Sequence, residues 1–408
     1  MSKERIISGI DIGSSKICTI ISQVSPEKIS VIGVSSIPSK GIKRGVVVDI
    51  DQAVESISAS LEAAERMAGY AVSNAYVSVD GSHISSLNSK GVVAVSSTDG
   101  EISEEDVARA TEAAQAISIP GSQEIIHVIP RDFIVDSQEG VKNPIGMSGI
   151  RLEVETNIIY GSSTSMRNLT KCVAQVGVDV SDLVFSGIAA SNSVLSDTEK
   201  ELGTVLVDIG GGTTQVCIFQ GGSPYYCAVL PVGGQNITND LAIGLRTSLE
   251  VAEKAKIKVS QTNGTAVEDE ISLVGLGGEG TETASRKMFE EIIRARLLEI
   301  FNLVGAEIKK SGLMGKVPGG VVLTGGGSET RGTLEAAKSV LKVPVRVGLP
   351  NGVTGLIDEI VGPAYSCSVG LIIFGSKASP TSFFSLFGKS RISGPFAKAA
   401  GWFKSFLP

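Results

Sequence analysis

The chain has 408 residues, of which 42% are hydrophobic and 19% charged, and its formal charge is −7 at neutral pH. This length predicts two or more domains, and this balance excludes a chain that is disordered throughout. The net negative charge argues against a general nucleic-acid binder, because neutralising phosphates requires a basic surface.

The N-terminus and the cysteines bear on where the protein works. Residues 1–5 are polar and lead directly into a strand-like segment, so we expect no secretion signal. The five cysteines include no C-x-x-C pair, which predicts neither a zinc site nor a disulfide framework. The sequence contains no run of 18 apolar residues, so no membrane-spanning helix is predicted. We expect a protein of the reducing cytosol, with at most a peripheral membrane role.

A glycine-containing turn follows the first strand-like segment. The sequence Asp11-Ile-Gly-Ser-Ser-Lys16 joins two apolar, β-rich runs. Glycine lets a phosphate approach the backbone, serines and exposed amides supply donors, and Lys16 adds a positive charge. The turn is a candidate phosphate-binding hairpin, although a plain Gly-Ser turn capped by Asp11 accounts for it as well when it is taken alone.

The next part of the chain mixes helix and strand patterns. Ser103 precedes three acidic residues, as expected of a helix N-cap. We interpret residues 84–162 as a small inserted α+β subdomain, closed by the polar stretch 136–149. The expected helices are 50–67, 104–116 and 166–176, and the expected strands are 74–80, 124–135 and 154–160.

The second half of the chain repeats the first motif. Asp208-Ile-Gly-Gly-Gly-Thr-Thr214 follows an apolar strand, and in both halves three strand-like segments succeed one another. Three consecutive glycines weaken a hairpin unless something approaches its backbone closely. Two such hairpins, one from each half, would grip a polyphosphate, and Asp11 and Asp208 would hold the hydrated Mg²⁺ that accompanies it. The repeat predicts an α/β protein with two similar halves.

A third glycine cluster, residues 319–328, follows another apolar strand and precedes an expected helix at 330–341. Backbone without Cβ atoms at the start of a helix can approach a sugar or a flat ring closely. The cluster indicates a nucleoside site, and a tight turn without a ligand is the alternative. Further helices are expected at 236–245 and 283–310.

The C-terminal tail differs from the rest of the chain. After Glu359 it has no acidic residue but five cations, and seven of the 19 aromatic side chains lie beyond residue 375. Residues 376–394 are typical of a linker, and residues 395–408 form an amphipathic pattern with cations beside aromatic rings. We expect a membrane-targeting helix, with docking on the protein body as the alternative. The expected membrane-facing residues are Phe396, Trp402, Phe403, Lys404, Phe406 and Leu407.

These motifs together resemble a known superfamily. DIGSSK at 11–16, DIGGGTT at 208–214 and VVLTGGGS at 321–328 are similar to the two phosphate motifs and the adenosine motif of the actin, sugar-kinase and heat-shock chaperone ATPases. Within it, the chain resembles the FtsA family of actin-like bacterial division proteins over nearly its whole length. The segments that carry this closer resemblance are KGIKRGVVVDI (40–50), HVIPRDFIVDSQEGVKNPIGMSG (127–149) and LPVGGQNITNDLAIGL (230–245).

The resemblance implies an actin-like fold of two lobes with duplicated ribonuclease-H-like cores. In this family the small subdomain of the first lobe is displaced from its place in actin, and residues 84–162 correspond to it. The expected division is 1–83 with 163–196 and 357–375 for the first-lobe core, 84–162 for its small subdomain, 197–241 with 312–356 for the second-lobe core, 242–311 for its small subdomain, 376–394 for the linker and 395–408 for the terminal helix.

The resemblance also implies ATP with Mg²⁺ in the cleft between the lobes. The phosphates would contact a hairpin from each lobe, and the adenosine would contact the third glycine cluster. Asp11 and Asp208 would hold Mg²⁺ through water. The implied nucleotide-binding residues are Asp11, Gly13, Ser14, Ser15, Lys16, Asp208, Gly210, Gly211, Gly212, Thr213, Thr214, Gly233, Gly234, Glu253, Lys256, Gly325, Gly326, Gly327 and Ser328.

We expect hydrolysis to be weak or absent. Actin-like hydrolases usually orient the attacking water with a Gln or Glu from the helix that links the lobes. The corresponding stretch here, 184–195, contains neither. The nucleotide is therefore expected to act mainly as a conformational and polymerisation switch.

Partners are implied as well. FtsA proteins polymerise on the cytoplasmic face of the membrane at the division site, tether the ring of the tubulin-like protein FtsZ and recruit later division proteins. Arg286 and Arg296 are the candidates for binding the FtsZ C-terminal peptide, with an ordinary solvated helix face as the alternative. Further copies of the chain and anionic lipids are the other expected partners, and nucleic acid is not one.

Two other functions compete with this interpretation. A soluble sugar or acetate kinase of the same superfamily is disfavoured by the tail, and a pilus-assembly adaptor with the same nucleotide motifs is disfavoured by the amphipathic end. Weaker patterns are set aside: the G-x-G-x-x-G match at 275–280 and Gly388-Lys-Ser390 are interpreted as loop and linker, and His83 and His127 as structural.

Overall fold

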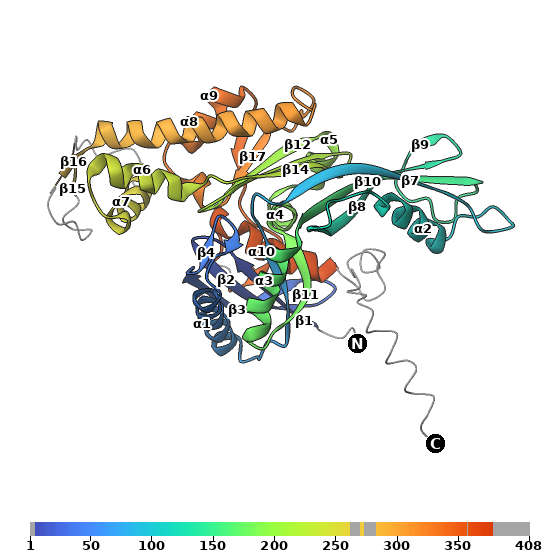
Figure 1. Cartoon of the computed structure of the whole chain (residues 1–408), viewed down its shortest axis with the longest axis horizontal. Helices are drawn as coiled ribbons and strands as arrows, with labels where there is room; N and C mark the ends of the chain where they lie inside the picture. Colours follow the sequence, from blue (N-terminus) through green and yellow to red (C-terminus); the bar gives the residue numbers. More distant parts are fainter. Residues whose placement is uncertain (1–4, 262–269, 273–282, 357, 378–408) are drawn as a thin grey trace, which may run out of the picture.

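The structure, a computed structural model, describes residues 5–261, 270–272, 283–356 and 358–377. Within these ranges, a six-stranded and a nine-stranded sheet carry the main part of the fold. Figure 1 shows the first lobe below, the second lobe above it, and an arm of strands that extends to the right. The expected two-lobed α/β architecture is confirmed.

The first lobe is a mixed sheet with helices on both faces. Its elements are β1 (Arg5–Ile12), β2 (Lys16–Val24), β3 (Ile29–Pro38), β4 (Ile42–Lys43), β5 (Val46–Val47), α1 (Ile50–Ala68), β6 (Asn74–Val79), α3 (Ser163–Gln175), β11 (Asp179–Phe185), α4 (Ser186–Val194), β19 (Thr354–Gly355), η3 (Pro363–Tyr365) and α10 (Ser366–Lys377). Strand β2 is apolar on both faces, because Ile17 packs in the cluster that contains α1 and Ile20 in the cluster that contains α10.

The second lobe repeats the strand order of the first. Its elements are α5 (Asp197–Leu202), β12 (Thr204–Ile209), β13 (Thr214–Gln220), β14 (Ser223–Leu230), β17 (Val321–Thr324), η2 (Gly326–Glu329), α9 (Thr333–Leu341) and β18 (Val345–Val347). In each lobe three antiparallel strands are followed outward by two parallel ones, in the orders β3-β2-β1-β6-β11 and β14-β13-β12-β17-β18. The expected duplication is therefore present in the topology.

The insert forms the arm of Figure 1. Its elements are β7 (Ser85–Ala94), α2 (Glu104–Gln115), β8 (Gln123–Val135), β9 (Gln138–Val141) and β10 (Arg151–Ser162). The arm continues the sheet of the second lobe, because β7 pairs with β14 at Ser85 and Ala228. Ser86 Oγ adds hydrogen bonds with the backbone of Cys227, and Asn157 donates to the carbonyl of Tyr225. The insert thus extends the sheet of the second lobe.

A helical unit covers the far end of the second lobe. It contains α6 (Gly234–Leu245), α7 (Leu249–Gln261), β15 (Glu270–Ser272), β16 (Thr283–Ser285) and α8 (Arg286–Lys310). The buried face of α8 includes Phe289, Leu297 and Phe301, which pack in one cluster with α6, α7 and the β12 to β14 strands. This packing fixes the positions of α6 and α7 relative to the hairpin between β12 and β13.

Two sequence predictions about the insert need correction. The polar segment Ser85–Ala94 was not predicted as a strand, yet it pairs with β10 along its whole length. The stretch 136–149, expected as a polar connection, contains β9, because Asp136 and Ser137 adopt positive φ angles of 47° and 81° and turn the chain back onto β8. The expected N-cap is present, since Ser103 and Asp106 form a capping box on α2.

Three expected boundaries are also shifted. The helix expected from 283 begins at Arg286, because the preceding three residues pair with β15. The helix expected from 330 begins at Thr333, after Gly332 with a φ of 87°. Helix α10 continues to Lys377, so the first two residues assigned to the linker are helical.

The two histidines have backbone partners. His127 Nε2 accepts from the amide of Phe185 at 3.0 Å, and burial lowers the pKa of His127 to about 4. His83 Nδ1 accepts from the amide of Ser162 at 3.2 Å.

Several segments discussed from the sequence lie outside the described residues. They are the rest of the linker, the expected terminal helix 395–408 and the G-x-G-x-x-G match at 275–280. Among the residues that are described, no helix is long and apolar enough to cross a membrane.

Candidate functional site

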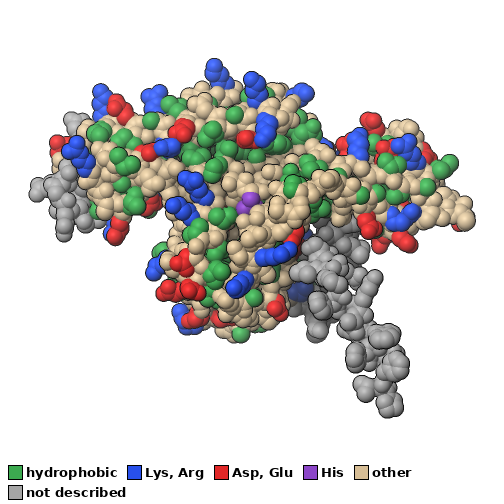
Figure 2. Space-filling view, in the orientation of Figure 1, with side chains coloured by type: hydrophobic (Ala, Val, Ile, Leu, Met, Phe, Trp, Pro, Cys, Tyr) green, Lys and Arg blue, Asp and Glu red, His purple; other side chains and the backbone are tan. Residues whose placement is uncertain are grey.

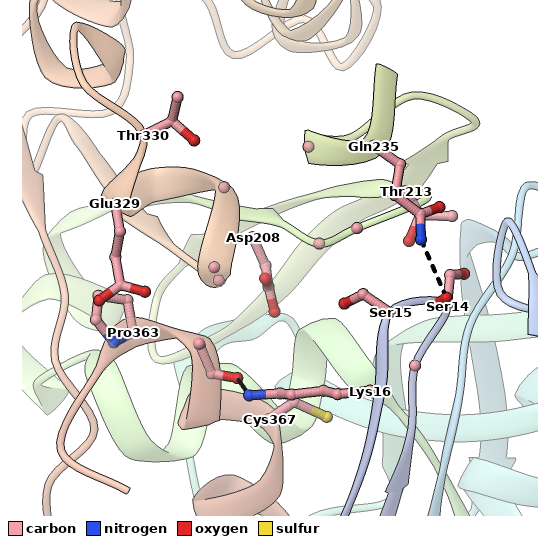
Figure 3. A pocket seen from close by; sticks show the side chains of 18 of the residues that line it. Ser14, Ser15, Lys16, Asp208, Thr213, Gln235, Glu329, Thr330, Pro363 and Cys367 are labelled. Atoms are coloured by element: carbon pink, nitrogen blue, oxygen red, sulfur yellow. Dashed lines mark hydrogen bonds between the residues drawn. The ribbon is translucent and has the colours of Figure 1, made fainter. Parts of the chain in front are cut away.

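A cavity of about 470 Å³ lies where the two lobes meet, a volume suited to a small-molecule ligand. Both glycine hairpins, the third glycine cluster and helix α7 contribute to its wall. In Figure 3, Asp208 lies in the middle of the view, with Glu329 and Thr330 to one side and Ser14, Ser15 and Thr213 to the other. Elements far apart in the sequence therefore meet around one space.

The first hairpin is the tight turn between β1 and β2. It is closed by a hydrogen bond from the amide of Gly13 to the carbonyl of Lys16 at 3.0 Å. Asp11, at the end of β1, accepts from Ser78 Oγ at 2.9 Å and from Ser368 Oγ at 2.8 Å. Strand β6 and helix α10 thus hold one carboxylate oxygen each, and this fixes the orientation of the Asp11 side chain.

Lys16 is held at the floor of the cavity. Its ammonium group donates to the carbonyl of Ala364 and lies 3.4 Å from the ring centroid of Tyr365, a cation–π arrangement. Figure 3 shows the hydrogen bond of the Lys16 ammonium group as a dashed line below Asp208. The cation is therefore placed at the cavity wall by residues that immediately precede α10.

The second hairpin, between β12 and β13, touches the first. A Cβ atom on Gly211 would lie 2.8 Å from Ser15 Cβ, and one on Gly212 would lie 2.8 Å from Ser14 Oγ. Gln235 donates to the carbonyl of Ser14 at 3.2 Å across the gap, as Figure 3 shows. Only glycine permits this approach, so the glycine run follows from the contact between the two hairpins.

Asp208 is a buried carboxyl group on the cavity wall. Burial, together with the negative charges of Asp11 and Asp80, raises its pKa to about 8, although the charge of Lys16 opposes this shift. A buried acid beside other acids is the setting in which a cation binds favourably. Among the described residues no group of three or more side chains converges as direct metal ligands. The acidic side chains of this wall therefore have the chemistry that suits a cation.

The third glycine cluster packs against the strand that carries Asp208. A Cβ atom on Gly325 would lie 2.1 Å from Asp208 Oδ1, and the φ of Gly325 is 79°. Gly327 leaves room for Ile209, whose Cγ2 would lie 2.3 Å from an added Cβ. Gly326, in contrast, faces open space, with only Ala364 Cβ at 3.5 Å. The cluster presents bare backbone to the cavity at this position.

Two charged residues of α7, Glu253 and Lys256, also line the cavity. Lys256 donates to Glu253 at 2.7 Å and to Thr238 Oγ1 at 2.8 Å, and its side chain is 9% exposed. It also donates to the carbonyl of Gly234 at 3.1 Å. The hydrogen bonds of Lys256 to Gly234 and Thr238 join α7 to α6, and the Glu253 side chain, which also lines the cavity, is 42% exposed.

Most of the sequence-predicted site residues line this cavity, and four do not. Thr214 donates to the carbonyl of Val232, and Ser328 Oγ donates to the carbonyl of Gly325. Gly212 packs on Ser14, and Gly233 packs on the second hairpin, where an added Cβ would lie 2.5 Å from the carbonyl oxygen of Gly210. These four residues shape the loops that surround the cavity.

The sequence interpretation missed several residues of the wall. Among them are Ser78, Asp80, Gln215, Gln235 and Glu329. Asp80 follows β6, which lies parallel to β1, so its position at the same sheet edge as Asp11 was accessible from the strand pattern. Burial raises the pKa of Glu329, and Lys16 lowers it.

The two arginines predicted to bind a partner have different surroundings. Arg296 forms an ion pair with Asp240 of α6, at 2.6 and 2.9 Å, and a second with Glu299 at 2.7 Å. Arg286 lies at the start of α8, where it helps to line a separate shallow cavity with Lys287 and Arg294. Figure 2 shows Lys and Arg side chains along the upper edge of the molecule, where α8 and α9 lie, with acidic side chains between them.

Comparisons of the sequence point to one family. A model of the SHS2 domain inserted in FtsA matches residues 81–160, and a model of the cell division protein FtsA matches residues 205–370. The chain is 39% identical over 392 residues to the cell division protein FtsA of Pseudomonas aeruginosa, covering 95% of this chain and 93% of that protein. It is 42% identical over 378 residues to FtsA of Borreliella burgdorferi, covering 92% and 91%.

Comparisons of the structure point to one fold. The chain is similar to a chain of the PilM–PilN type IV pilus biogenesis complex, with a TM-score of 0.65, 16% identity and coverage of 91% and 99%. It is also similar to MreB5 of Spiroplasma citri bound to ADP, with a TM-score of 0.51, 12% identity and coverage of 91% and 96%. At these identities the likeness establishes the actin-like fold and nothing more specific.

Proposed function

The chain belongs to the FtsA family of bacterial cell-division proteins, and we propose that within division it is an ATP-binding, actin-like membrane tether for the FtsZ ring. In this proposal ATP and Mg²⁺ bind between the lobes. The chain polymerises on the cytoplasmic face of the cell membrane at the division site and recruits later division proteins. The cavity between the two glycine hairpins is the observation that carries the proposal.

The arrangement of the cavity supports nucleotide as the ligand. The two turns place Ser14, Ser15 and Gly211 on the cavity wall, where their backbone amides would contact a polyphosphate, and Lys16 supplies a cation beside them. Asp11 and Asp208 would hold the magnesium ion through its water ligands, and the ion would neutralise phosphate charge. The bare backbone at Gly326 and the exposed carboxylate of Glu253 would lie along the adenine and ribose.

Binding of a fluorescent ATP analogue with Mg²⁺ tests this proposal. Gly326→Phe places a ring in the open space beside the third glycine cluster, and we expect it to weaken binding at least tenfold. Gly121→Phe is the matched control, because nothing lies within 4 Å of an added Cβ at that surface position, which is remote from the cavity wall. Failure of the unmodified protein to bind the analogue contradicts the proposal.

Nucleotide is proposed to act chiefly as a switch, with slow turnover. Helix α4, which corresponds to the stretch expected to orient the attacking water, contains neither Gln nor Glu. Electron microscopy on lipid monolayers, with and without ATP, reports assembly and its nucleotide dependence together. The protein is first stripped of nucleotide. Filaments that then form equally well with and without ATP contradict the role of nucleotide as a switch.

The membrane anchor is proposed from the sequence of the tail. Four half-buried rings of roughly 100 Å² each supply on the order of 10 kcal/mol, and ordering a dozen residues costs about as much. Net binding of one anchor is therefore weak, and an assembly of anchors binds strongly. We expect truncation after Ser393 to release the protein from anionic vesicles in a sedimentation assay. Trp402→Glu in the full chain tests the same anchor with one substitution, and retained sedimentation of both variants contradicts it.

Helix α8 is proposed as the contact for the FtsZ C-terminal peptide, with Arg286 and Arg296 as the candidate residues. Titration of the peptide against Arg296→Glu is expected to show weaker binding. Asp240→Asn is the matched control, because it breaks the same ion pair with α6 but keeps the positive charge of Arg296. Equal affinity of Arg296→Glu and the unmodified chain removes this residue from the proposal.

A further inference from the structure

A second acidic group lies beside the two hairpins and has no part in the site proposed so far. Asp80 follows β6 and lies on the cavity wall, as does Gln215 of β13. Thr213 Oγ1 and Gln215 Nε2 both donate to Asp80 Oδ2, the latter at 2.8 Å. The cluster therefore joins the end of a first-lobe strand to the second hairpin.

Each of the two larger side chains in this cluster keeps one oxygen without a partner. Asp80 is 9% exposed and Gln215 is 4% exposed. Asp80 Oδ1 and Gln215 Oε1 are buried and accept no hydrogen bond from the described part of the chain. An unsatisfied buried acceptor costs free energy, and the cost is greater for a carboxylate. Two such acceptors at the wall of one cavity indicate a bound group that donates two hydrogen bonds.

We propose that Asp80 and Gln215 bind the water molecule that attacks the terminal phosphate of ATP. A water that donates one hydrogen bond to each acceptor keeps its lone pair for the phosphorus atom. This inference rests on the proposed binding of ATP between the hairpins. Both oxygens are buried in the structure, so the proposal requires that bound ATP opens this part of the wall to water.

The reaction is ordinary phosphoryl transfer to water. The water oxygen bonds to the γ-phosphorus, and the bond from that phosphorus to the β,γ-bridging oxygen breaks, with its electron pair going to ADP. One water proton passes to the Asp80 carboxylate and from it to bulk water, so the products are ADP and inorganic phosphate. Asp80 and Gln215 take the place of the Gln or Glu that α4 lacks. Only Asp80 can accept the proton, and a site with one such group is consistent with slow turnover.

Asp80→Asn tests this assignment with three measurements. Single-turnover phosphate release from the ATP-loaded protein is expected to fall about 100-fold, the lower end of the range for a general base. The affinity for a fluorescent ATP analogue is expected to be unchanged or higher, since a negative charge near the phosphates is removed. The melting temperature of the nucleotide-free protein is expected to rise, because a buried carboxylate with an unpaired oxygen is replaced by a neutral side chain.

The matched control is Asp182→Asn. Asp182 is a partly buried acid of β11 whose pKa burial raises to about 7, and it does not line the cavity. Its substitution is expected to leave phosphate release unchanged. Phosphate release by Asp80→Asn at the rate of the unmodified protein overturns the inference, as does ATP binding by the unmodified protein without measurable release. Absence of ATP binding instead overturns the proposed function, so the two failures are distinguishable.

Discussion

Two aspartates occupy equivalent positions in the duplicated hairpins, but their surroundings differ. Asp11 ends β1 and accepts one hydrogen bond on each carboxylate oxygen, from Ser78 and Ser368. Asp208 ends β12 and faces Gly325, which supplies no side chain. Burial, together with the nearby charges of Asp11 and Asp80, raises the pKa of Asp208 to about 8. One acid is held in a fixed orientation by donors, and the other depends on a cation to stay ionised.

The difference arises from the elements that flank each hairpin. In the first lobe, β6 and α10 bring serine hydroxyls to the end of β1. In the second lobe, the corresponding parallel strand β17 leads into the third glycine cluster, which approaches so closely that only glycine fits. A duplicated motif therefore does not bring duplicated surroundings, because the elements that contact each aspartate are not part of the repeat.

The largest effect is expected from disturbing the second acid. Gly325→Ala places a Cβ atom 2.1 Å from Asp208 Oδ1 and forces alanine into a φ of 79°. Overlap and backbone strain together are expected to lower the unfolding free energy by about 3 kcal/mol or more. Urea unfolding of the nucleotide-free protein measures this.

Gly326→Ala is the neighbouring control, because its Cβ would meet only Ala364 Cβ at an ordinary 3.5 Å. Its unfolding midpoint is expected to stay near that of the unmodified chain. Equal losses at both positions would mean that the approach of the loop to Asp208 is not what requires glycine.

The second prediction concerns pH. The pKa of Asp208 is raised from 3.8 to about 8, so its protonated form is favoured in the folded chain. Stability from this group is present at low pH and is lost as pH rises from about 4 towards 8. Asp208→Asn is therefore expected to be more stable than the unmodified protein at about pH 8, by several kcal/mol at about 1.4 kcal/mol per pKa unit, and similar to it at about pH 4. Urea unfolding with a chelator present, at a series of pH values, gives the difference.

Other acids also titrate in this range, among them Asp182, whose pKa is raised to about 7. The comparison of Asp208→Asn with the unmodified protein cancels their contribution. A constant difference between the two proteins across the pH series contradicts the raised pKa. The negative charges of Asp11 and Asp80 contribute to the raised pKa of Asp208, and a bound Mg²⁺ would offset them. Added Mg²⁺ is therefore expected to reduce the stability difference between the two proteins.

Much of the arrangement could be predicted from the sequence. The glycine runs at 13, 210–212 and 325–327 mark places where backbones must come close, and the structure brings all three to one cavity. The duplication was visible because an apolar strand, an aspartate and a glycine turn recur together. These features can be recognised in the sequence because each one reflects a local requirement of the backbone.

The missing part depends on long-range contacts. Asp80 and Gln215 belong to different lobes, and neither stands in a glycine motif, so only the pairing of β6 with β1 and the contact of the hairpins bring them together. Strand β7 was missed because its sequence is polar and its pairing partner β10 lies far along the chain. The ion pair of Arg296 with Asp240 likewise joins two helices whose packing the sequence alone does not specify.

The smallest effect is expected from loosening the first acid. Ser368→Ala removes one of the two donors to Asp11, and a hydrogen bond to a charged group contributes about 1.5 kcal/mol or somewhat more. The unfolding free energy at neutral pH is expected to fall by about that amount. Ser376→Ala is the control on the same helix, because its hydroxyl only donates to the carbonyl of Ile373. If Ser368→Ala destabilises no more than this control, Asp11 does not need its donors, and the contrast with Asp208 reduces to burial alone.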